Sequence, residues 1–229
     1  DVSDRSWHIQ VESDLPIGKG LGSSAAIAVA IVRAFDKLLD LGLDDARVNE
    51  VAFESEKLAH GTPSGVDNTL ATYATPMLFR NEDGLEFDAI EPGEVPPIVI
   101  AWGAETGRTS EQVAGVRARR EQAREHFDAL FDEMDRLSRK GARYLEAGNW
   151  PALGALMNLC HGLLNAIGVS TPQLERMVSV ARLAGAAGAK LTGAGGGGSI
   201  VALCPGTVAE VCLALQRAGY STIVPGDAE

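Results

Sequence analysis

Pro16-Ile17-Gly18-Lys19-Gly20-Leu21-Gly22-Ser23-Ser24-Ala25-Ala26 is the most informative segment of this 229-residue chain. Its three glycines let the backbone approach a ligand closely, and the small apolar residues from Ala25 to Leu41 predict a helix that Gly42 ends. The N–H groups and the positive dipole end at the start of this helix favour a phosphate chain, and Ser24 would add a hydroxyl ligand for Mg²⁺. The alternative is a strand-to-helix turn that Ser23 or Ser24 caps. A Walker loop is excluded, because neither Ser nor Thr follows Gly18-Lys19.

The rest of the chain predicts an α+β protein. Alternation of apolar and polar residues predicts a strand at 7–13, and a helix is expected at about 45–59. Further strands are expected at 70–80, 97–102, 189–191, 199–203 and 221–224, and further helices at about 109–147, 151–167, 172–187 and 208–218. From Ile98 onward the order is that of a ferredoxin-like layer, with extra helices in the first crossover. We therefore predict two domains, residues 1–100 and 101–229.

A second segment, Glu54-Ser55-Glu56-Lys57-Leu58-Ala59-His60-Gly61-Thr62-Pro63-Ser64-Gly65-Val66-Asp67-Asn68, places two acids on either side of a tight turn. A phosphotransferase needs one carboxylate for its metal ion and another beside the attacking hydroxyl, and Glu56 and Asp67 are candidates. The alternative is structural, because Ser64 and Asp67 also fit a capping box and Glu56 fits an ordinary helix surface. Spacing by itself favours this structural alternative.

A third segment, Leu191-Thr192-Gly193-Ala194-Gly195-Gly196-Gly197-Gly198-Ser199, contains a formal G-x-G-x-x-G pattern. A dinucleotide fingerprint must lead from a strand into a helix, with an acid ~20 residues later. Here a strand follows the glycines and no acid stands at that distance, so this interpretation fails. The remaining interpretation is a turn between two strands, although four consecutive glycines exceed what a hairpin needs. Cys160-His161 could suggest a nucleophile, but the pair lies in an apolar helical pattern without a recognisable partner, and His161 is expected to be structural or exposed.

Composition excludes several classes of protein. The chain has 31 acidic and 20 basic residues and a net charge of −11, which argues against nucleic acid or an anionic membrane as the main partner. No apolar run reaches the ~20 residues of a membrane helix, and the first residues do not form a signal peptide. Three cysteines without C-x-x-C spacing favour a reduced, cytoplasmic location.

Taken together and in this order, the three segments resemble the motifs of the GHMP kinases, the superfamily of galactokinase, homoserine kinase, mevalonate kinase and phosphomevalonate kinase. The second segment resembles mevalonate kinases in particular. So does Asn165-Ala166-Ile167-Gly168-Val169-Ser170-Thr171-Pro172. The resemblance implies the remainder of a nucleotide-binding α+β domain, followed by a ferredoxin-like domain. It also implies ATP- and Mg²⁺-dependent phosphorylation of the mevalonate 5-hydroxyl in isoprenoid synthesis.

The resemblance also implies a role for individual residues. Asp67 would be the catalytic base or orienting group, and Ser24 and Glu56 would hold Mg²⁺. The nucleotide would be bound by Pro16, Gly18, Lys19, Gly20, Leu21, Gly22, Ser23 and Ser24. The substrate would be bound by Ser64, Thr192, Gly195, Gly196 and Gly197.

One feature departs from the family pattern. The family's opening motif, with a lysine that contacts the catalytic aspartate, would lie before Asp1, and Lys19 cannot be assumed to replace that lysine. We therefore expect an unpaired edge at 7–13, an uncovered face on the helix of residues 25–41, and self-association or binding of a complementing N-terminal segment. Little mevalonate phosphorylation is expected from such a chain. The rival interpretations are a sibling kinase for phosphomevalonate or a sugar, and an inactive fragment that self-associates.

Overall fold

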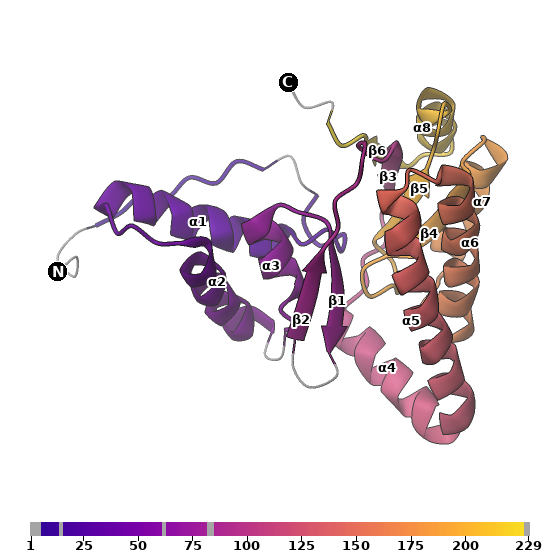
Figure 1. Cartoon of the computed structure of the whole chain (residues 1–229), viewed down its shortest axis with the longest axis horizontal. Coiled ribbons are helices and arrows are strands. Elements are labelled where there is room, and N and C mark those ends of the chain that lie inside the picture. Colours follow the sequence, from indigo (N-terminus) through magenta and orange to yellow (C-terminus); the bar gives the residue numbers. More distant parts are fainter. Residues whose placement is uncertain (1–5, 14–15, 61–62, 82–84, 227–229) are drawn as a thin grey trace. The chain divides into compact units, whose positions relative to one another are not determined.

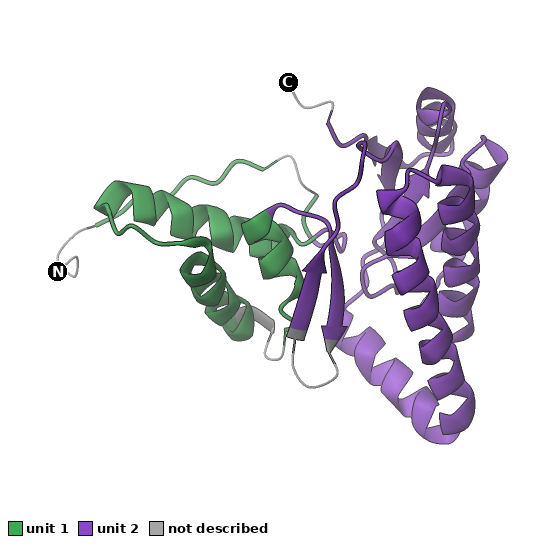
Figure 2. Ribbon diagram, in the orientation of Figure 1, with its two compact units in different colours: residues 1–17, 22–73 green, residues 18–21, 74–229 purple. Residues whose placement is uncertain are grey.

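The computed structural model describes residues 6–13, 16–60, 63–81 and 85–226. The chain divides into two compact units, residues 1–17 with 22–73 (unit 1) and residues 18–21 with 74–229 (unit 2; Figure 2). The glycine-rich segment 16–26 therefore contributes to both units, with residues 18–21 in unit 2 and the others in unit 1. In the described part of the chain, no helix is long and apolar enough to cross a membrane.

Unit 1 is built from helices α1 (Ser23–Leu39), α2 (Asp45–His60) and α3 (Val66–Tyr73), which Figure 1 shows side by side. A small core joins them, in which Val29 of α1 packs with Val48 and Ala52 of α2. The Arg33 side chain donates hydrogen bonds to the Asp45 carboxylate and to the Thr72 carbonyl oxygen, both at 2.9 Å. Arg33 thus links α1 to the beginning of α2 and to the end of α3.

Two strands predicted in the first part of the chain are corrected by the structure. Residues 70–73 belong to α3, and the backbone changes direction at Ala74, which has a φ of 51°. The strand begins only at β1 (Met77–Asn81), which pairs antiparallel with β2 (Leu85–Ala89), a strand that was not predicted. Residues 7–13 are not assigned to a strand, because no described strand pairs with them.

Unit 2 contains the predicted ferredoxin-like sheet. Its strands are β3 (Ile98–Trp102), β4 (Gly188–Thr192), β5 (Ser199–Leu203) and β6 (Ser221–Ile223), all antiparallel and ordered β4-β5-β3-β6. Helices α6 (Trp150–Ala166), α7 (Pro172–Leu183) and α8 (Val208–Arg217) complete the layer. Leu174, Met177, Leu191, Ile200 and Leu215 are fully buried between helices and sheet. Burial of these side chains is the main stabilising term of the unit.

The long helix predicted at 109–147 is two helices, α4 (Thr109–Gln122) and α5 (Arg124–Glu146). They meet at Ala123, whose φ of −143° and ψ of 51° are not helical. The Arg120 guanidinium donates to the Asp128 carboxylate at 2.6 Å across this bend. The helical spacing of apolar residues continues through the bend, so the sequence pattern does not reveal it.

The domain boundary predicted near residue 100 falls inside β3, whereas the compact units change at residues 73 and 74. β3 pairs with β5 on one side and with β6 on the other. We propose a boundary before Ile98, because this position keeps the sheet whole.

Candidate active site

In unit 1 the start of α1 is capped by backbone conformation rather than by a side chain. Gly22 is the N-cap residue, with a left-handed φ of 67° and no side-chain cap hydrogen bond. Its carbonyl oxygen accepts the first helical bond from Ala26 N at 3.0 Å. The alternative in which Ser23 or Ser24 caps the helix is therefore wrong, because both serines already lie within its first turn. Their hydroxyls are not used as N-caps.

Ser24 instead contacts α2. Its hydroxyl donates to Glu56 Oε1 at 2.6 Å, although 32 residues separate the two in sequence. Glu56 is only 6% exposed, so it is not the ordinary surface residue that spacing favoured. A hydroxyl and a carboxylate are hard oxygen donors that suit Mg²⁺. Within residues 6–13, 16–60, 63–81 and 85–226 there is no cluster of three His, Cys, Asp or Glu side chains suited to a metal.

Asp67 lies beside the same helix start. A Cβ atom built on Gly22 would be 3.5 Å from Asp67 Cγ, so the carboxyl group of α3 reaches the beginning of α1. α3 begins at Val66, so Asp67 lies in its first turn, which is also where the capping-box alternative places it. The Ser64 hydroxyl accepts from Val66 N at 3.4 Å. Unit 1 thus brings Ser24, Glu56 and Asp67 to the N-terminal end of α1.

In unit 2, Lys19 fastens the segment 18–21. Its ammonium donates to the carbonyl oxygens of Gly103, Ala104 and Glu105 at 2.8, 3.1 and 3.3 Å. The Lys19 carbonyl oxygen accepts from Ser199 Oγ at 2.8 Å. An ammonium has three donors, so these contacts can occupy all of them. The side chain therefore holds the loop, and any contribution of Lys19 to ligand binding would come from its backbone.

The run of glycines joins β4 to β5 and contacts the same segment. Gly193 and Gly20 approach closely, since a Cβ on Gly193 would be 3.1 Å from the Gly20 carbonyl oxygen. Gly196 N donates to the Val169 carbonyl oxygen at 2.8 Å, and Gly198 N donates to that of Glu105 at 3.2 Å. Thr192 ends β4 opposite Ser199. We call residues 193–198 the glycine loop.

Close packing explains why the glycine loop needs more glycines than a hairpin. Gly195 has a φ of +78°, and a Cβ there would lie 2.8 Å from the Val169 Cβ and would overlap its carbonyl oxygen. A Cβ on Gly197 would lie 2.9 Å from Gly107 N. The loop is thus pressed between residues 103–107 and 167–171, and its amides are fixed by carbonyl groups on both sides.

Sequence reasoning missed these two bracing segments. Residues 103–107 had no assigned role, although two glycines in five residues were a signal of close backbone approach. The stretch 165–172 entered only as part of the resemblance, without a function. Their contribution is made by backbone carbonyl groups, and such groups leave little trace in residue type.

The chain is similar to known proteins in both its N-terminal and its C-terminal part. Residues 2–75 match the family model described as "GHMP kinases N terminal domain", and residues 142–221 match "GHMP kinases C terminal". The chain is 40% identical over 221 residues to mevalonate kinase of Pyrococcus abyssi, covering 94% of this chain and 65% of that protein. It therefore spans slightly less than two thirds of the length of that relative.

Solved structures show the same similarity. The crystal structure of L. major mevalonate kinase in complex with R-mevalonate matches with a TM-score of 0.81 and 34% identity, over 90% of this chain and 67% of that one. The crystal structure of Methanococcus jannaschii mevalonate kinase also has a TM-score of 0.81, with 28% identity over 93% of this chain and 66% of that one. The similarity thus extends across both compact units.

Proposed function

This chain belongs to the GHMP kinase family, and we propose that its activity is the transfer of the γ-phosphoryl group of ATP to the 5-hydroxyl of mevalonate, a step of isoprenoid synthesis. The relatives named above support mevalonate as the acceptor. The observation that carries the proposal is the meeting of Ser24, Glu56 and Asp67 at the start of α1. A helix start with free N–H groups, a hydroxyl–carboxylate pair and a separate carboxylate is what phosphoryl transfer requires.

Each residue has a proposed part in the reaction. Asp67 orients the substrate hydroxyl and accepts its proton while the hydroxyl oxygen forms a bond to the γ-phosphorus. The bond from that phosphorus to ADP breaks, and ADP leaves. Backbone N–H groups at the start of α1 and in residues 18–21 stabilise the phosphate charge. Ser24 and Glu56 would hold Mg²⁺, which when bound neutralises phosphate charge.

Ser64, Thr192 and the glycine loop are each proposed to contact the substrate. Gly196 N and Gly198 N donate to the carbonyl oxygens of Val169 and Glu105, and these bonds fix the loop before a ligand arrives, so that its other N–H groups are the proposed donors. Fixed donors stabilise a transferring phosphoryl group without the cost of reorganising at the moment of reaction. Gly195, Gly196 and Gly197 are the proposed contacts in this loop.

The proposed acceptor is tested by offering a panel of alcohols to the purified protein. ADP release from MgATP is measured with mevalonate, phosphomevalonate, galactose and homoserine, and without any acceptor. We expect ADP release with mevalonate well above all other reactions. Preference for another alcohol would replace mevalonate by that sibling substrate, and release equal to the acceptor-free reaction with every alcohol would contradict a kinase function.

The metal ligands give a second prediction. Ser24→Ala and Glu56→Gln are each expected to raise the Mg²⁺ concentration for half-maximal activity by about tenfold, since a contact to a charged group contributes about 1.5 kcal/mol or more. The matched control is Glu54→Gln on the same helix, because Glu54 is exposed and pairs with Lys57 at 2.7 Å. Magnesium titrations of Ser24→Ala and Glu56→Gln that superimpose on the control would exclude both residues as ligands.

We further propose that a second copy of the chain binds to an apolar groove in unit 1. The groove has a volume of about 620 Å³ and lies between residues 7–13 and one face of α1. Ile9 and Val11 are exposed beside it, and no described strand pairs with their backbone. An extended segment that could pair as a strand, beside an exposed apolar face, recruits other chains.

Self-association should therefore respond to a charge placed in this groove. Leu38 lines the groove and is 60% exposed, whereas Leu183, on α7, is 86% exposed and lies outside it. Leu38→Glu is expected to shift the molar mass measured by light scattering towards the monomer, and Leu183→Glu is expected to leave it unchanged. A parent chain that is monomeric at every concentration would contradict the proposal.

A cytoplasmic location is also part of the proposal. It is supported by Cys160, Cys204 and Cys212, which are all free cysteines.

A further inference from the structure

The segment between α6 and α7 carries the carbonyl group that holds the glycine loop. Val169 is 5% exposed, and its carbonyl oxygen accepts from Gly196 N at 2.8 Å. The Arg119 side chain supports the same segment from α4 by donating to the carbonyl oxygens of Ile167 and Gly168 at 2.9 and 3.3 Å. A shift of this segment would therefore move an amide of the glycine loop.

Glu175 ties both ends of this segment together. Its Oε1 atom accepts from Asn165 Nδ2, at the end of α6, at 2.7 Å and from Ser170 Oγ at 2.5 Å. Burial by itself raises the pKa of Glu175, but the hydrogen bonds from Ser170 and Asn165 lower it and prevail. Glu175 is therefore ionised at neutral pH, and hydrogen bonds to a carboxylate are stronger than those to a neutral acceptor.

His161 connects the same carboxylate to the strand that leads into the loop. Its side chain is 4% exposed, and its Nδ1 atom accepts from Leu191 N on β4 at 3.3 Å. Its Nε2 atom is buried and lies 3.0 Å from Glu175 Oε1, but the two atoms do not form a hydrogen bond. Burial lowers the pKa of His161, with Glu175 opposing and Arg182 and Lys190 reinforcing this effect. The neutral ring can accept at Nδ1, as the contact to Leu191 requires.

We propose that Glu175 is a positioning residue for phosphoryl transfer, acting through Asn165 and Ser170 on the Val169 carbonyl and so on the glycine loop. The inference rests on the kinase function proposed above. We propose no direct contact between Glu175 and either ATP or the alcohol substrate. With it in place the loop amides are aligned before substrate binds, and without it the 167–171 segment is held at fewer points. A misplacement of ~1 Å far from the reacting atoms can reduce a rate about 100-fold.

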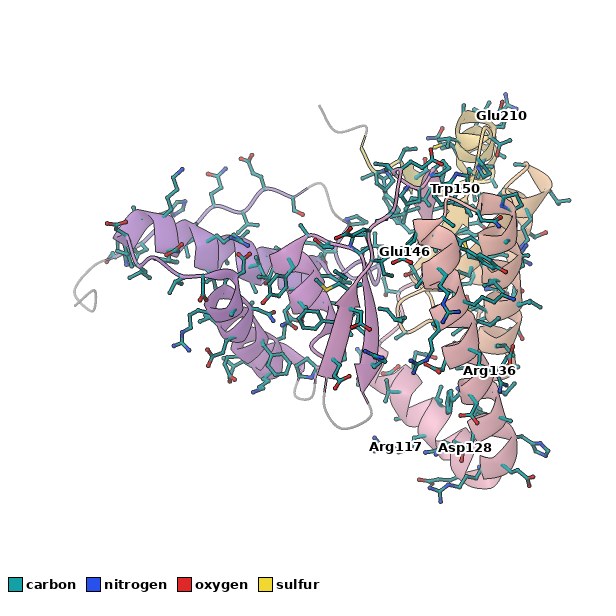
Figure 3. The ribbon with its side chains drawn as sticks, viewed as in Figure 1. Arg117, Asp128, Arg136, Glu146, Trp150 and Glu210 are labelled. Carbon is teal, nitrogen blue, oxygen red and sulfur yellow. The ribbon has the colours of Figure 1, made fainter. Side chains whose placement is uncertain are left out.

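The test compares three variants with the parent. Glu175→Ala removes the acceptor of both hydrogen bonds, whereas Glu175→Gln keeps an acceptor oxygen and removes the charge. Glu210→Ala is the matched control, because Glu210 is also an acid in the first turn of a helix of unit 2 and is exposed on α8 (Figure 3). Hydrogen–deuterium exchange is measured for peptides over 192–199 and over α8, and kcat and KM are measured for mevalonate and ATP.

We expect amides 192–199 to exchange ~10-fold faster in Glu175→Ala, since local opening requires fewer contacts to break. Exchange in α8 should stay unchanged, and kcat should fall ~10- to 100-fold with little change in the KM for ATP. Glu175→Gln should restore most of the protection and of kcat. A purely structural role would instead speed exchange in α8 and over 192–199 alike.

The exchange measurement needs no enzymatic activity, so it separates this inference from the proposed function. Parent-like exchange over 192–199 in Glu175→Ala would overturn the positioning role even in an active kinase. Should that variant fail to fold, Ser170→Ala removes one of the two hydrogen bonds and is expected to show a smaller change in the same direction. Parent-like exchange in Ser170→Ala would then overturn the inference.

Discussion

Replacement of Asp67 by asparagine is expected to lower kcat by ~10²–10⁴-fold, the usual contribution of a general acid or base. Asparagine keeps the size of the side chain but cannot accept the hydroxyl proton. Affinity for ATP should barely change, because the phosphates are proposed to bind to backbone amides and metal ligands rather than to Asp67. The measurement is steady-state kinetics with mevalonate, together with a separate titration of nucleotide binding.

The control for this variant is Asp45→Asn. Asp45 occupies the first turn of the neighbouring helix α2, as Asp67 occupies the first turn of α3, and it pairs with Arg33 on the surface. Exposed pairs of this kind contribute little, so Asp45→Asn should retain nearly all of kcat. An Asp67→Asn variant that behaves like this control would show that Asp67 takes no part in proton transfer.

Helices and strands with strong local signals were predictable from the sequence. β5 was expected at 199–203 and occupies Ser199–Leu203, because a buried apolar run follows the glycines directly. The ferredoxin-like order from Ile98 onward is confirmed by the β4-β5-β3-β6 sheet. α7 begins at Pro172, where Thr171 accepts from Leu174 N at 3.3 Å as an N-cap. In each case the residue type and the local geometry agree.

Elements that depend on distant packing were not predictable. Residues 70–73 have β-forming character, yet Thr69 and Thr72 of α3 are buried in unit 1, and burial fixes the helix. Residues 85–89 alternate like a strand, but only pairing with 77–81 makes them one. The bend at Ala123 has neither Pro nor Gly to mark it. Tertiary contacts override or complete local preference at these places.

In the candidate site, too, local sequence signals were predictable and contacts between distant residues were not. The glycine segment and its following helix indicated a phosphate site without further help. Ser24 and Glu56 could be paired only through the resemblance, because their contact joins two helices across 32 residues of sequence. The Val169 carbonyl could not be found from residue type at all, since every residue has a carbonyl group. The residue proposed to position this carbonyl group is Glu175, which in the sequence looks like an ordinary acidic residue in the first turn of α7.

The glycine loop supplies the second large expected effect. In Gly195→Ala the new methyl group would overlap the Val169 carbonyl oxygen and lie 2.8 Å from its Cβ. Both neighbours belong to a buried residue, so the loop must move. We expect kcat/KM for mevalonate to fall ~100-fold or more, because displaced amides no longer meet the charge that develops on the phosphoryl group.

Strain from the backbone must be separated from this displacement, and Gly206→Ala provides the control. Gly206 has a φ of +75°, close to the +78° of Gly195, but a Cβ there meets nothing within 4 Å. Each variant bears a similar conformational cost of about 1–3 kcal/mol, so both should show a lowered Tm. Only Gly195→Ala should lose activity, because only its methyl group displaces the loop. Equal losses of activity in the two variants would mean that the effect is general destabilisation and that the contact with Val169 does not position the loop.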